Sequence, residues 1–151
     1  LLAKLDGWIT KQVINYINKR DDERPLFLYL SYMKPHAGHN VPKGYEDLYN
    51  ADTINYAKQP NWQEDKSPHS EGVNRRDMYE DYWKNASEKE WKLMTMRYYA
   101  NVTWIDDMIG RTLKALKDKG LLENTLIVYT SDHGEMLGER YYKFNKYNSC
   151  R

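Results

Sequence analysis

The sequence predicts an α/β fold, part of a mostly parallel sheet flanked by helices, and three observations carry this prediction. Two short runs, 26–32 and 124–130, are almost continuously apolar, as in strands buried on both faces. Helical periodicity over 88–118 ends just before the second run. A polar cluster follows each run directly. This order is typical of open α/β sheets, in which ligands bind at the carboxyl ends of strands.

The first predicted helix covers residues 8–19, where Ile9, Val13 and Ile17 recur at helical spacing. Asp6 is a candidate N-cap for it. The segment 33–87 holds four of the five prolines and many polar residues. We expect irregular chain there, with a few short helical turns, and so long an excursion is more often functional than inert.

The helix over 88–118 is the strongest periodic signal and is about 46 Å long at 1.5 Å per residue. Ser87 and Glu90 form a candidate capping box at its start, and Gly120 is a candidate stop. Its predicted apolar face consists of Trp91, Met94, Tyr98, Val102, Ile105, Ile109, Leu113 and Leu116. This face should pack on the sheet.

The composition excludes several classes of protein. The 151 residues allow one modest domain, and 23 basic against 22 acidic side chains leave a net charge of +1. Such balance argues against nucleic acid as a partner. No apolar run approaches the roughly 20 residues of a membrane span. The single cysteine, Cys150, excludes an internal disulfide framework. Oligomeric state has no signature here.

Three polar clusters are candidates for chemistry. In the cluster after the second run, Asp132 offers a carboxylate to a cation, and His133 offers a nitrogen ligand or a proton shuttle. A polar turn that caps a helix is an equally good interpretation of this cluster. The cluster after the first run contains Lys34, His36 and His39, and would lie at the same sheet edge; its alternative is a proline-rich loop with solvated histidines. Residues 143–147 add a lysine pair able to neutralise an anion, or simply a solvated basic turn.

These residues carry a resemblance to a known family. The matching features are Arg97-Tyr98-Tyr99-Ala100, the helix through Leu116, the run Asn124–Val128 and the sequence Ser131-Asp132-His133-Gly134. Together with the Lys-Pro-His sequence and Lys146-Tyr147, they resemble the sulfatase family of the alkaline-phosphatase-like superfamily. The forms closest to this chain are iduronate-sulfatase-like and bacterial polysaccharide sulfatases.

The resemblance implies a sulfuric ester hydrolase that uses a formylglycine nucleophile and a divalent metal, usually calcium. By position, Asp132 and His133 would be metal ligands. His36 and Lys146 would be catalytic, the first protonating the leaving oxygen and the second neutralising charge. Lys34 and His39 would contact the substrate, a sulfated small molecule or saccharide. Family members of this kind are periplasmic, secreted or lysosomal.

Two of the family's features are missing. No Cys or Ser begins the nucleophile motif, and the early Asp-Asp metal pair is absent, since Asp21-Asp22 follows a polar stretch and Asp106-Asp107 lies within a helix. We therefore expect residues 1–151 to be a fragment of the catalytic domain, inactive alone, without its nucleophile segment and C-terminal subdomain. Two alternatives stay open: a phosphate-ester or phosphonate hydrolase of the same superfamily, and a non-catalytic module with a degenerate site.

Overall fold

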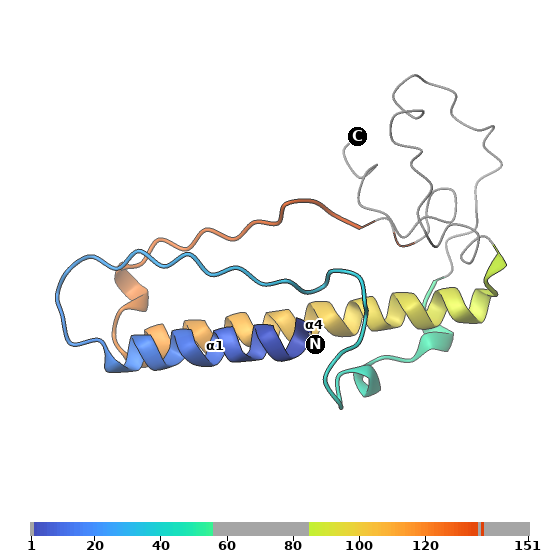
Figure 1. Cartoon of the computed structure of the whole chain (residues 1–151), viewed down its shortest axis with the longest axis horizontal. Coiled ribbons are helices and arrows are strands. Elements are labelled where there is room, and N and C mark those ends of the chain that lie inside the picture. The colour runs from blue at the N-terminus through green and yellow to red at the C-terminus, as the bar shows by residue number, and fades with distance from the viewer. Residues whose placement is uncertain (1, 56–84, 136, 138–151) are drawn as a thin grey trace, which may run out of the picture. The chain divides into compact units, whose positions relative to one another are not determined.

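The structure is a computed structural model that describes residues 2–55, 85–135 and 137 (Figure 1). The chain forms two compact units, one from residues 1–50 and 96–127, the other from residues 51–95 and 128–151. The elements are the helices α1 (Leu2–Lys19) and α4 (Glu88–Asp118) and the 3-10 turns η1 (Glu46–Leu48), η2 (Ala51–Thr53) and η3 (Leu122–Asn124). Helix α4 contributes residues to both units.

In the first unit, α1 runs parallel to α4 and beside it (Figure 1). Gly7 makes the close approach possible at one end, because a Cβ atom there would lie 3.3 Å from the Trp104 ring. At the other end, Ile17 packs against Ala115 and Leu116. The pair of helices is the framework of this unit.

The segment 26–32 returns along α1 in the opposite direction and alternates its side chains like a strand. Leu26 and Leu28 pack on the core, and the Tyr32 hydroxyl lies 3.2 Å from the Thr10 hydroxyl. The intervening side chains point away, so Phe27 is 90% exposed and Tyr29 is 83% exposed. One face of this segment is therefore buried and the other is open.

The core of the first unit lies where α1, the end of α4 and this returning segment meet. Burial of apolar side chains there is the main favourable term in its stability. Its buried members are Ile17, Ala115 and Leu116, and the partly buried side chains packed against them are Val13, Ile14, Leu26, Leu28, Leu113, Leu121 and Leu122.

Both predicted ends of α4 are confirmed. The Ser87 backbone N–H donates to the Glu90 carboxylate at 2.7 Å, and the Glu90 N–H donates to the Ser87 hydroxyl at 3.3 Å, which completes a capping box. Gly120 has a φ of 72°, and the N–H groups of Gly120 and Leu121 donate to the Lys117 and Leu116 carbonyls. This is a Schellman motif. The turns η1 and η2 confirm the expected short helical turns.

Helix α1 starts earlier than predicted, at Leu2 rather than residue 8. Asp6 is not its N-cap, because the carboxylate is directed away to the backbone of Met33 and Lys34. With the side chain engaged by a distant segment, the helix continues through Asp6 and Gly7. A tertiary contact has overridden a local capping signal.

The predicted strands are extended but unpaired. Among residues 2–55, 85–135 and 137 there is no β-strand, so the parallel sheet of segments 26–32 and 124–130 stays a prediction. A strand is defined by hydrogen bonds to a neighbour, and neither segment has such a neighbour among these residues. Leu126 and Val128 are 89% and 79% exposed, so the expectation of burial on both faces is wrong for the chain by itself.

The buried face of α4 also differs from the predicted one. Val102 is 45% exposed, whereas Asn101 is fully buried. The Asn101 amide nitrogen donates to the Arg97 carbonyl at 2.8 Å, whereas its buried Oδ1 has no hydrogen-bond partner among the described residues. Thr112 is also buried, with its hydroxyl donating to the Met108 carbonyl. An apolar periodicity rule cannot find positions where a buried polar side chain donates to a carbonyl of its own helix.

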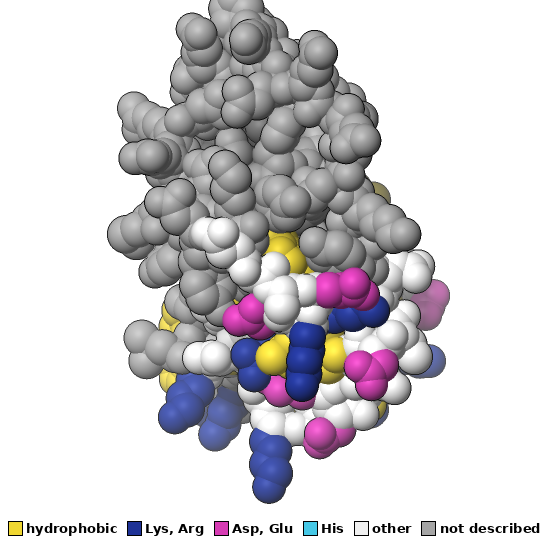
Figure 2. Space-filling model, turned by 90° about the vertical axis from the view of Figure 1, so that its right-hand side faces the viewer, with side chains coloured by type: hydrophobic (Ala, Val, Ile, Leu, Met, Phe, Trp, Pro, Cys, Tyr) yellow, Lys and Arg dark blue, Asp and Glu magenta, His cyan; other side chains and the backbone are white. Residues whose placement is uncertain are grey.

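Neither described helix is long and apolar enough to cross a membrane. On the face drawn in Figure 2, the described acidic and basic side chains are interspersed around a small apolar patch. This mixture agrees with the balanced composition and gives that face no field of one sign.

Two positions of α4 that differ in burial, Ile105 and Val102, provide a test of which face of the helix is buried. Ile105 is only 8% exposed, so Ile105→Ala should lower the free energy of unfolding by about 2–5 kcal/mol, through lost burial and a residual cavity. Val102→Ala should change it by no more than about 0.5 kcal/mol, as at ordinary surface sites. Urea unfolding of both variants measures the difference. Equal losses would show that the buried face has been misplaced.

Candidate active site

The predicted Lys-Pro-His cluster forms a turn that is anchored to α1. The Asp6 side chain is fully buried, and its two oxygens accept the backbone N–H groups of Met33 at 2.9 Å and Lys34 at 3.1 Å. Hydrogen bonds to an ionised acceptor are among the stronger ones in proteins. The end of the returning segment is thereby fixed to the second turn of α1.

Lys34 turns its side chain inward. The residue is 5% exposed, and its ammonium group donates to the His36 carbonyl at 3.4 Å and to the Gly38 carbonyl at 2.5 Å. Burial lowers the pKa of Lys34, and the nearby Asp6 carboxylate opposes that shift. Gly38 has a φ of 84°, a backbone conformation that favours glycine. The lysine thus binds the turn that it begins.

His36 stands at the exposed tip of the turn. Its backbone N–H donates to the Met33 carbonyl at 3.1 Å, and its ring Nδ1 lies 3.4 Å from the Ala37 carbonyl oxygen. The backbone is held while the imidazole is open to solvent. This combination is suited to a group that acts on a bound molecule.

His39 lies further in, against α4. Its ring makes an edge contact with Tyr98, with 5.9 Å between ring centroids, and its carbonyl accepts the Asn101 amide at 3.2 Å. Burial, followed by the positive charges of Lys34, His36 and Arg97, lowers the pKa of His39 to about 4. The imidazole is therefore neutral near pH 7.

Asp132 and His133 are adjacent in the second unit. The Asp132 carboxylate is 86% exposed, and its Oδ2 lies 3.3 Å from His133 Nε2. His133 Nδ1 lies 2.8 Å from the Gly134 carbonyl oxygen, which can only accept a hydrogen bond. A carboxylate and an imidazole are both side chains that can donate an electron pair to a divalent cation.

These two donors make an incomplete cage. The described residues bring together no group of three or more His, Cys, Asp or Glu side chains able to hold a metal. Lys146, the other predicted catalytic residue, lies outside the described residues. His36 belongs to the first unit and the Asp132-His133 pair to the second.

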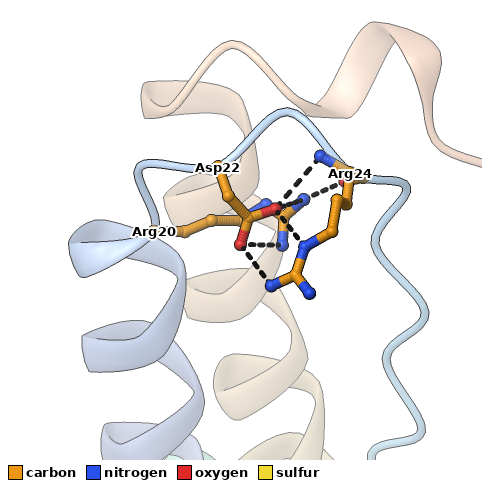
Figure 3. Close-up of polar contacts among 3 residues, drawn as sticks. All are labelled: Arg20, Asp22 and Arg24. Carbon is orange, nitrogen blue, oxygen red and sulfur yellow. Dashed lines mark hydrogen bonds and ion pairs between the residues drawn. The ribbon is translucent and has the colours of Figure 1, made fainter.

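One member of each acidic pair set aside in the sequence, Asp22 and Asp107, is engaged in structural contacts. Asp22 sits between two guanidinium groups, with Arg20 Nη2 at 2.8 Å and Arg24 Nη2 at 3.1 Å (Figure 3). Its hydrogen bond to the Arg24 side chain is the main cause that lowers the pKa of Asp22. These contacts close the turn between α1 and the returning segment.

Asp107 is held in the same manner. The Tyr45 hydroxyl donates to it at 2.5 Å and Arg111 at 2.7 Å, and the Tyr45 hydrogen bond is the main cause that lowers its pKa. Tyr45 also packs edge-on against Trp104. Asp107 therefore ties the turn η1 region to α4.

Two anchoring residues were missed by sequence reasoning, Asp6 and Asn101. Each is a polar side chain inside a helix, and each is fully buried. The available signal was a lone short polar residue on an otherwise apolar helical stripe. That signal indicates burial, but it does not identify a partner nearly thirty or sixty positions away in the chain.

A family model described as Sulfatase matches residues 3–150, nearly the whole chain. The chain belongs to the sulfatase family.

Curated relatives agree with this membership. An arylsulfatase of Clostridium perfringens is 31% identical over 88% of this chain and 27% of its own length. Arylsulfatase K of Bos taurus is 33% identical over 98% of the chain and 30% of its own length. Iduronate 2-sulfatase of Mus musculus is 31% identical over 89% of the chain and 26% of its own length. The chain thus spans less than a third of the length of these relatives, and the expected likeness to iduronate sulfatases is confirmed.

The lowered pKa of His39 predicts a pH dependence of stability. The unfolded imidazole takes up a proton near pH 6.5 and the folded one only near pH 4, so His39 destabilises the fold progressively as pH falls from 6.5 to 4. The loss should be on the order of 1–3 kcal/mol. It should be measured as the difference in unfolding free energy between the parent and His39→Gln at pH 7 and pH 4.

A parent-minus-His39→Gln difference that is the same at pH 7 and at pH 4 would contradict the burial assigned to His39.

Proposed function

We propose that the full-length protein hydrolyses sulfate esters of a carbohydrate, and that residues 1–151 are part of its catalytic domain. The observation that supports this most is the family match over residues 3–150, which includes the anchored turn and the Asp132-His133 pair. The nucleophile, a formylglycine by family resemblance, lies outside these residues. A periplasmic, secreted or lysosomal location belongs to the same proposal.

The chain's own residues have separate tasks in this reaction. As the S–O bond breaks, its electron pair stays on the ester oxygen, and the protonated His36 imidazole gives that oxygen a proton. Lys146 neutralises charge on the sulfate and on the leaving group. Both groups favour the transition state over the bound ester, because negative charge develops at the leaving oxygen only as the bond breaks.

Asp132 and His133 would hold the divalent metal, for which calcium is the family's usual choice. When bound, such a cation polarises the sulfate and lowers the cost of charge on its oxygens. The exposed Asp132 carboxylate and the His133 imidazole are the donors that this chain supplies. Further ligands would come from elsewhere in the full-length protein.

The two lysines near the end of the chain test the assignment. Lys146→Ala in the full-length protein should lower turnover of an aryl sulfate by about 10²–10³-fold, the usual loss for one preorganised charge contact. Lys143→Ala should change it only slightly. Steady-state sulfate release is the measurement, with folding checked by thermal melt. Loss of turnover in the Lys143 variant, with turnover retained in the Lys146 variant, would show that the family's lysine has been assigned to the wrong residue.

The same assay separates the competing functions. Turnover of an aryl phosphate that exceeds turnover of the sulfate would favour a phosphate-ester hydrolase. No turnover of either ester by a folded, metal-loaded protein would favour a non-catalytic module.

Metal dependence is tested at Asp132. A chelator should abolish sulfate release by the full-length protein, and added calcium should restore it. Asp132→Ala should raise the calcium concentration for half-maximal activity by at least about 10-fold, since a direct ligand is lost. The exposed Asp47→Ala is the matched control and should leave that concentration unchanged. Restoration by zinc or manganese but not by calcium would contradict the choice of metal.

A further inference from the structure

The turn that carries His36 is fixed by two buried charges that do not yet have a role in the reaction. Asp6 is fully buried and binds the backbone where the turn begins. Lys34 is 5% exposed and binds the carbonyl oxygens of His36 and Gly38 from the inside. Asp6 thus fixes the backbone where the turn begins, and Lys34 fixes the carbonyl groups of His36 and Gly38 within the turn.

We propose that Asp6 and Lys34 are positioning residues for His36, which they orient through the backbone of residues 34–38. This inference rests on the proposed sulfatase function, in which His36 protonates the leaving oxygen. Under this inference Lys34 positions His36, in place of the direct substrate contact that the family resemblance implies for it.

The cost of burying these charges supports a dedicated role. A buried ion is expensive unless it is paired and hydrogen-bonded. Here the Asp6 carboxylate has two N–H donors, and the Lys34 ammonium directs donors to two carbonyl oxygens within 3.4 Å. A solvent-exposed loop could have dispensed with both charges. Their arrangement restricts the backbone on each side of the one exposed imidazole.

The geometry also opposes a substrate contact for Lys34. Two of the three donors of a lysine ammonium are directed into the turn, and the side chain is almost fully covered. The ammonium lies 2.5 Å from the Gly38 carbonyl oxygen, so its closest contact is within the turn. The exposed His36 ring, in contrast, needs no rearrangement to meet a ligand.

Positioning has a characteristic kinetic signature. A shift of about 1 Å in a catalytic group can cost roughly 10²-fold in rate without weakening binding. Loss of a positioning residue should therefore lower kcat and leave KM nearly unchanged. It should also have no effect once the group that it positions has been removed.

A double-mutant cycle in the full-length protein tests this. His36→Ala should lower kcat by about 10²–10⁴-fold, and Lys34→Met, which keeps the length of the side chain, by about 10–100-fold. The double variant should be no slower than His36→Ala alone, and inhibition by inorganic sulfate should be unchanged by Lys34→Met. Lys43→Met, an exposed lysine of the same loop, should behave as the parent.

The outcomes separate this inference from the proposed function. Losses that multiply in the double variant, or weaker inhibition by sulfate in Lys34→Met, mean direct contact with the substrate and overturn the inference alone. Full activity of His36→Ala overturns the catalytic role of His36 and the inference with it. If Lys34→Met fails to fold, Asp6→Asn takes its place in the same cycle, with the same expected loss of kcat and the same expected non-additivity.

Discussion

The Asp6 carboxylate is the constraint on which the first unit depends most. It is fully buried in the second turn of α1, and it accepts the backbone N–H groups of Met33 and Lys34. Leaving a buried carboxylate without these donors would cost more than the hydrogen bonds themselves contribute. The returning segment must therefore end beside the N-terminal part of α1, and the position of the histidine turn follows from that requirement.

The described aspartate side chains differ in the groups that they contact. Asp22 and Asp107 are held by arginine side chains, and both have lowered pKa values. Asp132 differs from them, because its carboxylate is exposed and its neighbour is an imidazole. Since a carboxylate occupied by guanidinium groups has few lone pairs left to offer, Asp132 is the better candidate for a cation.

The extended segments 26–32 and 124–130 have the apolar composition of buried strands, yet many of their side chains are exposed because the segments are not paired with a neighbouring strand among the described residues. Phe27 and Leu126 are 90% and 89% exposed, which is unusual for large apolar side chains arranged in rows. The relatives are more than three times as long as the matched region, since it covers only 26–30% of them. These exposed rows agree with the prediction that segments 26–32 and 124–130 are strands of one sheet in the full-length protein.

The sequence alone determined the local features: both ends of α4, its periodicity, and the polar clusters that carry the family resemblance. Each depends on residues within a few positions of one another, so Ser87 and Gly120 could be assigned without a fold. Only the tertiary structure decided which buried polar side chains serve as anchors. The partners of Asp6 and Asn101 lie 27 and 62 positions away. Only folding of the chain brings such distant groups together, and hydrophobic periodicity cannot predict which residues become partners.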